Sequence, residues 1–160
     1  MTVTIRKAEQ EDIPGIQRTA KISWQNTYRA LIPSHVQEQF IENAYSDEMM
    51  QKRLERSILI VAEEDGEIIG FANGFTNSEK AELAAIYLLP EVQGRGIGTR
   101  LLEAVVLNLD GYQELFVEVE KGNDRGEQFY EAKGFRFVRE YEDELFGHKL
   151  RTKQLVLPIN

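Results

Sequence analysis

The chain has 160 residues, a length typical of one domain that buries its core without disulfide or metal support. It contains no cysteine, which excludes thiol nucleophiles, disulfides and cysteine metal sites and agrees with a reducing compartment. Its formal charge of −8 argues against nucleic acid or an anionic membrane as a partner and favours a cationic substrate.

The N-terminal half begins with an alternating segment, residues 2–7, that predicts a strand. A helix should follow, because Asp12 is a suitable N-terminal cap and Pro14 falls in the first turn. No run is apolar for long enough to span a membrane, and the N-terminus lacks the apolar core of a signal peptide. We therefore expect a cytoplasmic protein with one domain over residues 1–160.

The remaining elements follow from hydrophobic spacing and turn residues. We expect helices at 34–41, 46–56 and 101–109, a hairpin of strands 58–62 and 67–75 around Asp65-Gly66, strands at 83–89 and 115–119, a helix after Asn123, and a closing hairpin of strands 135–141 and 149–157.

A glycine-rich loop separates the strand at 83–89 from the next helix. Such a loop lets successive backbone N–H groups converge on an anion at the positive end of a helix. It lacks the lysine of a P-loop and the spacing of the dinucleotide fingerprint. The loop is either a pyrophosphate site or an ordinary strand-to-helix turn, and it comprises Gln93, Gly94, Arg95, Gly96, Ile97, Gly98 and Thr99.

Two motifs together resemble a known family. Gln93-Gly94-Arg95-Gly96-Ile97-Gly98 resembles the Gln/Arg-x-x-Gly-x-Gly/Ala signature of the GCN5-related N-acetyltransferases. Asn123, followed by Phe129-Tyr130 and Gly134-Phe135, resembles the second signature of that family. Gly126 departs from it, because alanine is usual at that position. The opening of the chain, Ile5 to Ile13, is also similar, so the resemblance spans nearly the whole sequence.

The resemblance implies an α/β fold: a mixed, strongly twisted sheet of about seven strands with helices on both faces. Coenzyme A should lie in the opening between the strand that ends at Leu89 and the strand that ends at Val119. The resemblance also implies a homodimer, since members of that family often dimerise.

The implied function is N-acetylation, in which acetyl-coenzyme A gives its acetyl group to a primary amine that attacks it directly in a ternary complex. The acceptor stays open among small cationic amines, polyamines, antibiotic amines and peptide N-termini. Two alternatives remain: a non-catalytic sensor of acetyl-coenzyme A, and a nucleotide-binding module.

The resemblance also implies roles on the cofactor side. The glycine loop would hold the pyrophosphate, and backbone N–H groups of Ile86, Tyr87 and Leu88 would face the thioester carbonyl. Asn123 is a helix cap, a contact to the pantetheine arm, or both. Tyr130 either protonates the leaving thiolate or only lines the pocket.

On the acceptor side a carboxylate must hold the ammonium group and take its proton. Glu82 is the first candidate, although it could equally belong to a solvated loop edge, and Glu118 is the second. Trp24 and Tyr28 belong to a segment that contacts the acceptor in part of the family, or they pack into the core. His35 and His148, the only histidines, have no ligand-spaced partner, so we expect no metal.

Overall fold

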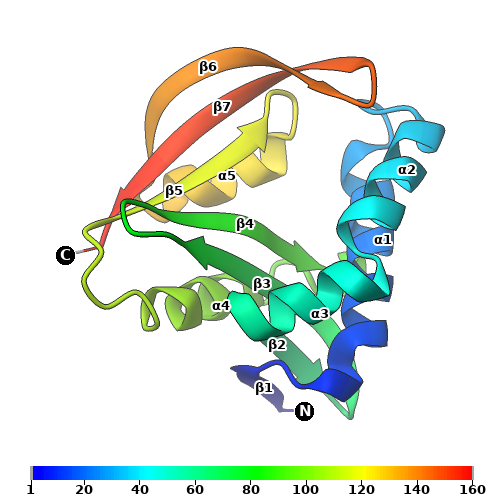
Figure 1. The fold of residues 1–160 in the computed structure, drawn as a ribbon, viewed down its shortest axis with the longest axis vertical. Coiled ribbons are helices and arrows are strands. Elements are labelled where there is room, and N and C mark those ends of the chain that lie inside the picture. The colour runs from blue at the N-terminus through cyan, green and yellow to red at the C-terminus, as the bar shows by residue number, and fades with distance from the viewer. Residues whose placement is uncertain (1, 160) are drawn as a thin grey trace.

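The computed structural model describes residues 2–159, and the predicted strands and helices occur in the predicted order (Figure 1). The strands are β1 (Val3–Lys7), β2 (Ile58–Glu64), β3 (Glu67–Thr76), β4 (Ala81–Leu88), β5 (Glu114–Glu120), β6 (Arg136–Leu145) and β7 (His148–Pro158). The helices are α1 (Ile13–Tyr28), α2 (Ser34–Ala44), α3 (Asp47–Arg56), α4 (Ile97–Val106) and α5 (Asp124–Ala132).

The seven strands form one mixed sheet in the order β1-β2-β3-β4-β5-β7-β6. Every neighbouring pair is antiparallel except β4 and β5, which are parallel and are connected through α4. The predicted fold class, a mixed sheet of seven strands, is confirmed.

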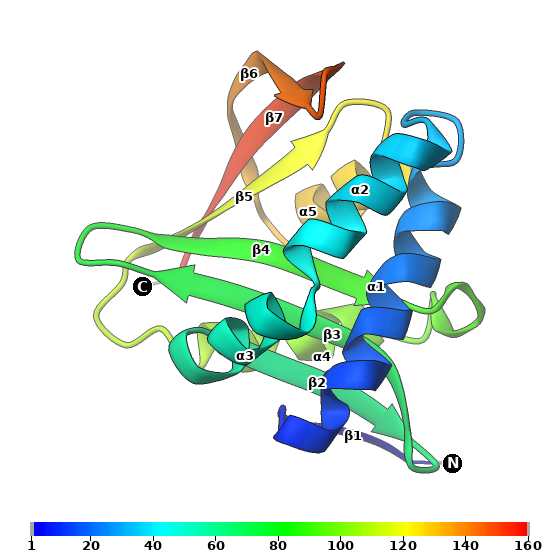
Figure 2. The same cartoon turned by 45° about the vertical axis from the view of Figure 1, so that its right-hand side comes forward.

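Helices cover both faces of the sheet, with α1, α2 and α3 on one side and α4 and α5 on the other (Figures 1 and 2). Successive side chains of β2 point to opposite faces of the sheet and contribute to the core on each face. Ile60 belongs to the core under α4, where Leu101 is fully buried, whereas Val61 belongs to the core under α1 and α3 with Ile16 and Met50. Because the sheet is buried on both faces, its central strands are almost continuously apolar.

The sheet forks between its two parallel strands. Pairing of β4 with β5 is limited to Ala81–Leu83 against Leu115–Val117. Beyond that point β4 continues along β3, and β5 continues along β7 to Glu120 opposite Thr152. The branch made of β5, β7 and β6 therefore diverges from β4 and leaves a gap in the sheet (Figure 1).

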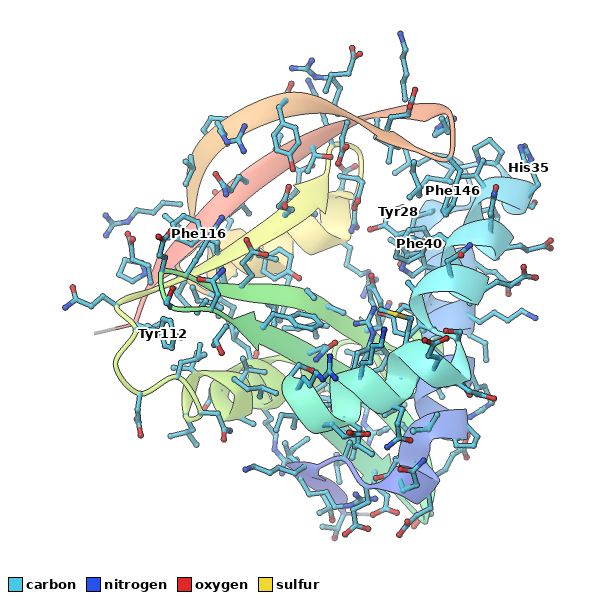
Figure 3. The ribbon with its side chains drawn as sticks, viewed as in Figure 1. Tyr28, His35, Phe40, Tyr112, Phe116 and Phe146 are labelled. Carbon is cyan, nitrogen blue, oxygen red and sulfur yellow. The ribbon has the colours of Figure 1, made fainter. Side chains whose placement is uncertain are left out.

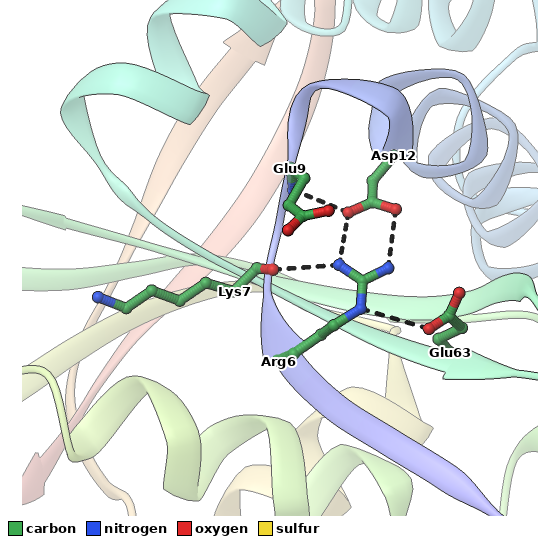
Figure 4. Close-up of polar contacts among 5 residues, drawn as sticks. All are labelled: Arg6, Lys7, Glu9, Asp12 and Glu63. Carbon is green, nitrogen blue, oxygen red and sulfur yellow. Dashed lines mark hydrogen bonds and ion pairs between the residues drawn. The ribbon is translucent and has the colours of Figure 1, made fainter.

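An ion-pair cluster fixes the N-terminal strand to the start of α1 (Figure 4). The two terminal nitrogens of Arg6 donate to the two carboxylate oxygens of Asp12 at 2.7 and 2.9 Å, and Arg6 Nε donates to Glu63 at 3.3 Å. Asp12 also accepts from the backbone N–H of Glu9, at 2.8 Å. Asp12 occupies the N-cap position of α1 as predicted, but its side chain makes no capping hydrogen bond to the helix, because Arg6 and the Glu9 N–H engage the carboxylate instead.

None of the helices formed by residues 2–159 combines the length and apolar character needed to cross a bilayer.

Candidate functional site

A cleft of about 570 Å³ opens where the sheet forks. Its walls come from both arms of the fork, the glycine loop, α5, the face of α1 and α2 that carries Trp24, Tyr28 and Phe40, and the β6–β7 hairpin. Tyr28 and Phe40 lie near the tip of that hairpin, where Phe146 is found (Figure 3). The core around Tyr28 includes Leu145 and Leu150 of the hairpin, so α1 and the hairpin close this side of the cleft together.

The glycine loop forms one end of the cleft. Gly94 and Gly96 have φ values of +81° and +79°, a backbone region that favours glycine, and α4 begins at Ile97 directly afterwards. The first turn of a helix has N–H groups without intrahelical partners, and its positive end attracts anions. Gln93, Gly94, Gly96, Ile97, Gly98 and Thr99 all line the cleft, as an anion site there requires.

Arg95 differs from its neighbours in the loop. Its guanidinium forms two hydrogen bonds with the Glu64 carboxylate, at 2.6 and 3.2 Å, and the residue is not part of the cleft lining. The pairing lowers the pKa of Glu64 and raises that of Arg95. The ion pair with Glu64 at the end of β2 directs the Arg95 side chain away from the cleft, so a cofactor contact of Arg95 stays a prediction that only its backbone could fulfil.

The arm of β4 carries the predicted oxyanion donors. Ile86, Tyr87 and Leu88 line the cleft beyond the point where β4 leaves β5, so backbone groups on that edge have no strand partner. The hydroxyl of Tyr87 accepts a hydrogen bond from Trp24 Nε1 at 2.8 Å. Burial holds the pKa of Tyr87 well above its usual range, so the phenol stays protonated.

Helix α5 supplies Asn123 and Tyr130 to the same cleft. The Asn123 side chain caps α5 by accepting from the Gly126 N–H at 3.0 Å, so its capping role and its place in the cleft lining coexist. This cap also explains the glycine at 126: a Cβ there would lie 2.5 Å from Asn123 Nδ2. Tyr130 packs against Phe129 and Phe135, and burial raises the pKa of its phenol.

The end of the cleft away from the glycine loop is acidic. Glu118 and Glu120 share one face of β5, because residues two apart on a strand point the same way. Burial and the charge of Glu82 raise the pKa of Glu118. The four carboxylates that line the cleft are Glu118, Glu120, Asp143 and Glu144, and among residues 2–159 none of them forms a salt bridge.

Glu82 is not brought into this group. It lies on the part of β4 that still pairs with β5, and its carboxylate meets Lys80 Nζ at 3.0 Å. The structure places Glu82 outside the lining of the cleft, so the base role expected for it has no geometric support.

Trp24 and Tyr28 serve the core and the cleft at once. Both are buried and their rings lie 4.6 Å apart. Trp24 bonds to Tyr87 on β4, and the Tyr28 hydroxyl donates to Glu120 on β5 at 2.6 Å. One turn of α1 is thus joined to both arms of the fork.

Sequence reasoning missed Glu120, Asp143 and Glu144. Strand alternation from Glu118 identifies Glu120 as its neighbour on the same face, so that signal was present. No local signal indicates Asp143 or Glu144, because only the bend of the β6–β7 hairpin brings them to the cleft. Within residues 2–159 no three side chains of the metal-ligating types form a group that could hold an ion.

Comparison with known proteins gives consistent matches. Residues 22–135 match the model of the acetyltransferase (GNAT) family. An uncharacterised N-acetyltransferase of Bacillus subtilis is 33% identical, over 98% of this chain and 93% of its own. A spermidine N(1)-acetyltransferase of Thermoplasma acidophilum is also 33% identical, over 85% of this chain and 89% of its own.

Among solved structures, the PaiA N-acetyltransferase of Thermoplasma acidophilum in complex with coenzyme A is similar, with a TM-score of 0.83 and 27% identity. The match covers 96% of this chain and 98% of that one.

Proposed function

The chain belongs to the acetyltransferase (GNAT) family and is an acetyl-coenzyme A-dependent N-acetyltransferase; on that premise we propose that its acceptor is the primary amine of a small cationic molecule, with polyamines as the first class to test.

The unpaired carboxylates at one end of the cleft are the observation on which this proposal rests. Glu118, Glu120, Asp143 and Glu144 have no cationic partner among residues 2–159, although carboxylates outside the cleft, such as Asp12, Glu64 and Glu127, pair with arginine or lysine. Negative charges crowded into a cleft attract a cation and raise its local concentration. An acceptor with two or more ammonium groups would match their spread over β5 and the β6–β7 hairpin.

The other end of the cleft suits the acetyl donor. The glycine loop and the start of α4 would hold the pyrophosphate, and Asn123 would contact the pantetheine arm. Bound there, acetyl-coenzyme A supplies an activated thioester. The exposed backbone edge of Ile86, Tyr87 and Leu88 would stabilise negative charge on its carbonyl oxygen.

Tyr130 is the proposed proton donor to the leaving sulfur. Its phenol lines the cleft and has no hydrogen-bond partner in the protein among residues 2–159, so it is free to donate to a ligand. Because burial raises its pKa, the phenol is protonated at neutral pH, as a donor must be. The amine would attack directly, since the chain has no cysteine to carry an acetyl group.

Release of the coenzyme A thiol, measured with a panel of amines, tests the proposal. The panel would include spermidine, putrescine, a monoamine with the chain length of putrescine and no second charged group, and a short peptide with a free N-terminus. We expect the polyamines to have the highest kcat/KM. A preference for the peptide would move the acceptor class to protein N-termini, and no thiol release with any amine would overturn the proposed acceptors as a class.

Ligand-induced stabilisation tests the cofactor side separately. At about 100 times its dissociation constant a ligand adds about 2.7 kcal/mol to stability, which is several degrees of Tm for a domain of this size. We expect acetyl-coenzyme A and coenzyme A to raise Tm, and ATP and NAD to leave it unchanged.

A further inference from the structure

Glu120 is the most constrained carboxylate of the acidic end. It is half-buried on β5 and lines the cleft. Its carboxylate accepts one hydrogen bond, from the Tyr28 hydroxyl at 2.6 Å, and no other hydrogen bond or ion pair to it occurs among residues 2–159. A partly desolvated negative charge with one neutral donor and no cation is costly unless a ligand compensates it.

Tyr28 limits where this carboxylate can lie. The tyrosine is 4% exposed and is packed among Trp24, Ile32 and Val36. Its burial, together with the charge of Glu120, raises its pKa well above the usual range, so its hydroxyl remains a donor. A rigid donor from α1 therefore fixes one carboxylate oxygen and leaves the other for the cleft.

Glu120 is the last residue of β5, and its backbone carbonyl accepts a hydrogen bond from the Asn123 N–H at 3.0 Å, where α5, the helix that carries Tyr130, begins. The charge of Glu120 contributes to the raised pKa of Tyr130 and of Tyr87. The charges that act on Glu118 are instead those of Glu82 and Asp143, and then Lys80 and Arg139. Of the two β5 carboxylates, Glu120 is thus the one that shares its surroundings with the proposed proton donor.

We propose that Glu120 is the catalytic base that binds the acceptor ammonium group and takes its proton, and that Tyr28 is a positioning residue that holds the Glu120 carboxylate for this step. The inference rests on the proposed function. It assigns the base role expected for Glu82 to a residue that lines the cleft.

The proton balance of the reaction is complete with these groups. An N–H bond of the ammonium breaks and its proton goes to the Glu120 carboxylate, directly or through one water. The freed electron pair of nitrogen forms the C–N bond to the acetyl carbon as the C–S bond breaks, and the sulfur takes a proton from Tyr130. The nitrogen then loses a second proton, which restores the Tyr130 phenol through solvent, and Glu120 releases its proton to solvent.

Replacement of the carboxylate by an amide is the first test. In Glu120→Gln the side chain keeps its size and can still accept from Tyr28, so the fold should be retained. We expect kcat/KM for the best cationic amine to fall by about 100-fold or more, the lower range for loss of a general base. The Kd of coenzyme A and the apoprotein Tm should not change.

Two variants on the same face of β5 serve as comparisons. Glu114→Gln lies outside the cleft and should keep wild-type activity. Glu118→Gln should raise KM with a smaller loss in kcat than Glu120→Gln. A loss below tenfold in Glu120→Gln, or a larger kcat loss in Glu118→Gln, would overturn the assignment.

The role of Tyr28 requires a double-mutant cycle. Tyr28→Phe should lower kcat about fivefold without changing the Kd of coenzyme A, and it should have no further effect on kcat in the Glu120→Gln background. Additive losses would mean that Tyr28 acts independently of Glu120 and would overturn the positioning role. If wild-type protein acetylates no amine, the proposed function itself fails; if it is active and Glu120→Gln is equally active, only this inference fails.

Discussion

The two ends of the cleft are built in different ways. The glycine end is a continuous stretch, Gln93–Thr99, and it presents backbone N–H groups and a helix start. The acidic end collects side chains from β5, β6 and α1, and its Tyr28–Glu120 hydrogen bond joins residues 92 positions apart. A site made of backbone recognises what every member of a family shares, whereas a site made of distant side chains can change its ligand by substitution.

A charge placed at the glycine end should have the largest effect. Thr99 stands in the first turn of α4 and lines the cleft, so Thr99→Glu puts a carboxylate beside the expected pyrophosphate. We expect coenzyme A affinity to fall by about 100-fold or more, since like charges about 4 Å apart near a protein surface repel by roughly 4 kcal/mol before screening.

The same substitution should stabilise the free protein by about 0.3 to 1 kcal/mol, because an acidic residue is favourable in the first turn of a helix. Titration calorimetry and thermal unfolding would measure the two effects. Thr99→Gln is the neutral control and should retain most of the affinity. Equal binding by Thr99→Glu and Thr99→Gln would remove the first turn of α4 from the phosphate site.

A substitution remote from both ends of the cleft should alter the stability of the protein without altering the binding of either substrate. Asp12→Asn removes charge from the Arg6 cluster, where the Asp12 side chain is 7% exposed, and should cost about 2 kcal/mol. The hydrogen bonds from Arg6 lower the pKa of Asp12. The contribution of the carboxylate is therefore complete above its unfolded pKa, near ~3.9, and is lost as pH falls through the lower folded value.

Urea unfolding between pH 3 and pH 7 measures this contribution. The gap in stability between wild type and Asp12→Asn should be constant above about pH 5 and should narrow as the medium becomes more acidic. KM for both substrates at pH 7 should match wild type. A stability difference that widens toward low pH would contradict the stabilising role given to the Arg6–Asp12 ion pair.

Tyr130 lies between the two ends of the cleft. Removal of its hydroxyl should affect the rate of the reaction but not the affinity for coenzyme A. Tyr130→Phe should lower kcat by about tenfold to 100-fold and leave the Kd of coenzyme A within a factor of two. Pre-steady-state thiol release compared with ligand binding would show the difference. A variant with wild-type kcat would limit Tyr130 to lining the pocket.

The smallest effect is expected at the rim of the acidic end. Asp143→Asn combined with Glu144→Gln removes two exposed charges and should raise KM about fivefold for a diamine but less than twofold for a monoamine. Exposed charges are screened by salt, so the difference should largely disappear in about 1 M NaCl. A salt-independent change would point to lost packing of the hairpin instead.

The position of the glycine end in the fold could be predicted from sequence because its information is local. The loop is one continuous stretch, and the cap at Asn123 and the aromatic pair at 129–130 belong to a second short stretch; the structure brings both to one cleft. Arg95 is the exception, since its partner Glu64 lies 31 residues away, at the end of β2.

The acidic end could not be predicted in the same way because it depends on where β4 and β5 separate. That point is set by tertiary packing, and it leaves Glu82 in the paired part of the fork while Glu118 and Glu120 lie beyond it. The order of the elements along the chain and both hairpins were accessible from alternation and turn residues, whereas the seven-stranded mixed sheet followed from the family resemblance. Which carboxylates line the cleft depends on this tertiary arrangement and not on the local sequence.

The double attachment of α1 has a consequence for how the chain can vary in length. Trp24 reaches β4 and Tyr28 reaches β5 from positions four apart, so both donors leave the helix on nearly the same side. One inserted residue between them would turn the second donor by about 100° around the helix axis and separate it from its acceptor. This interval should therefore reject insertions and deletions, even though single side chains within it can be exchanged.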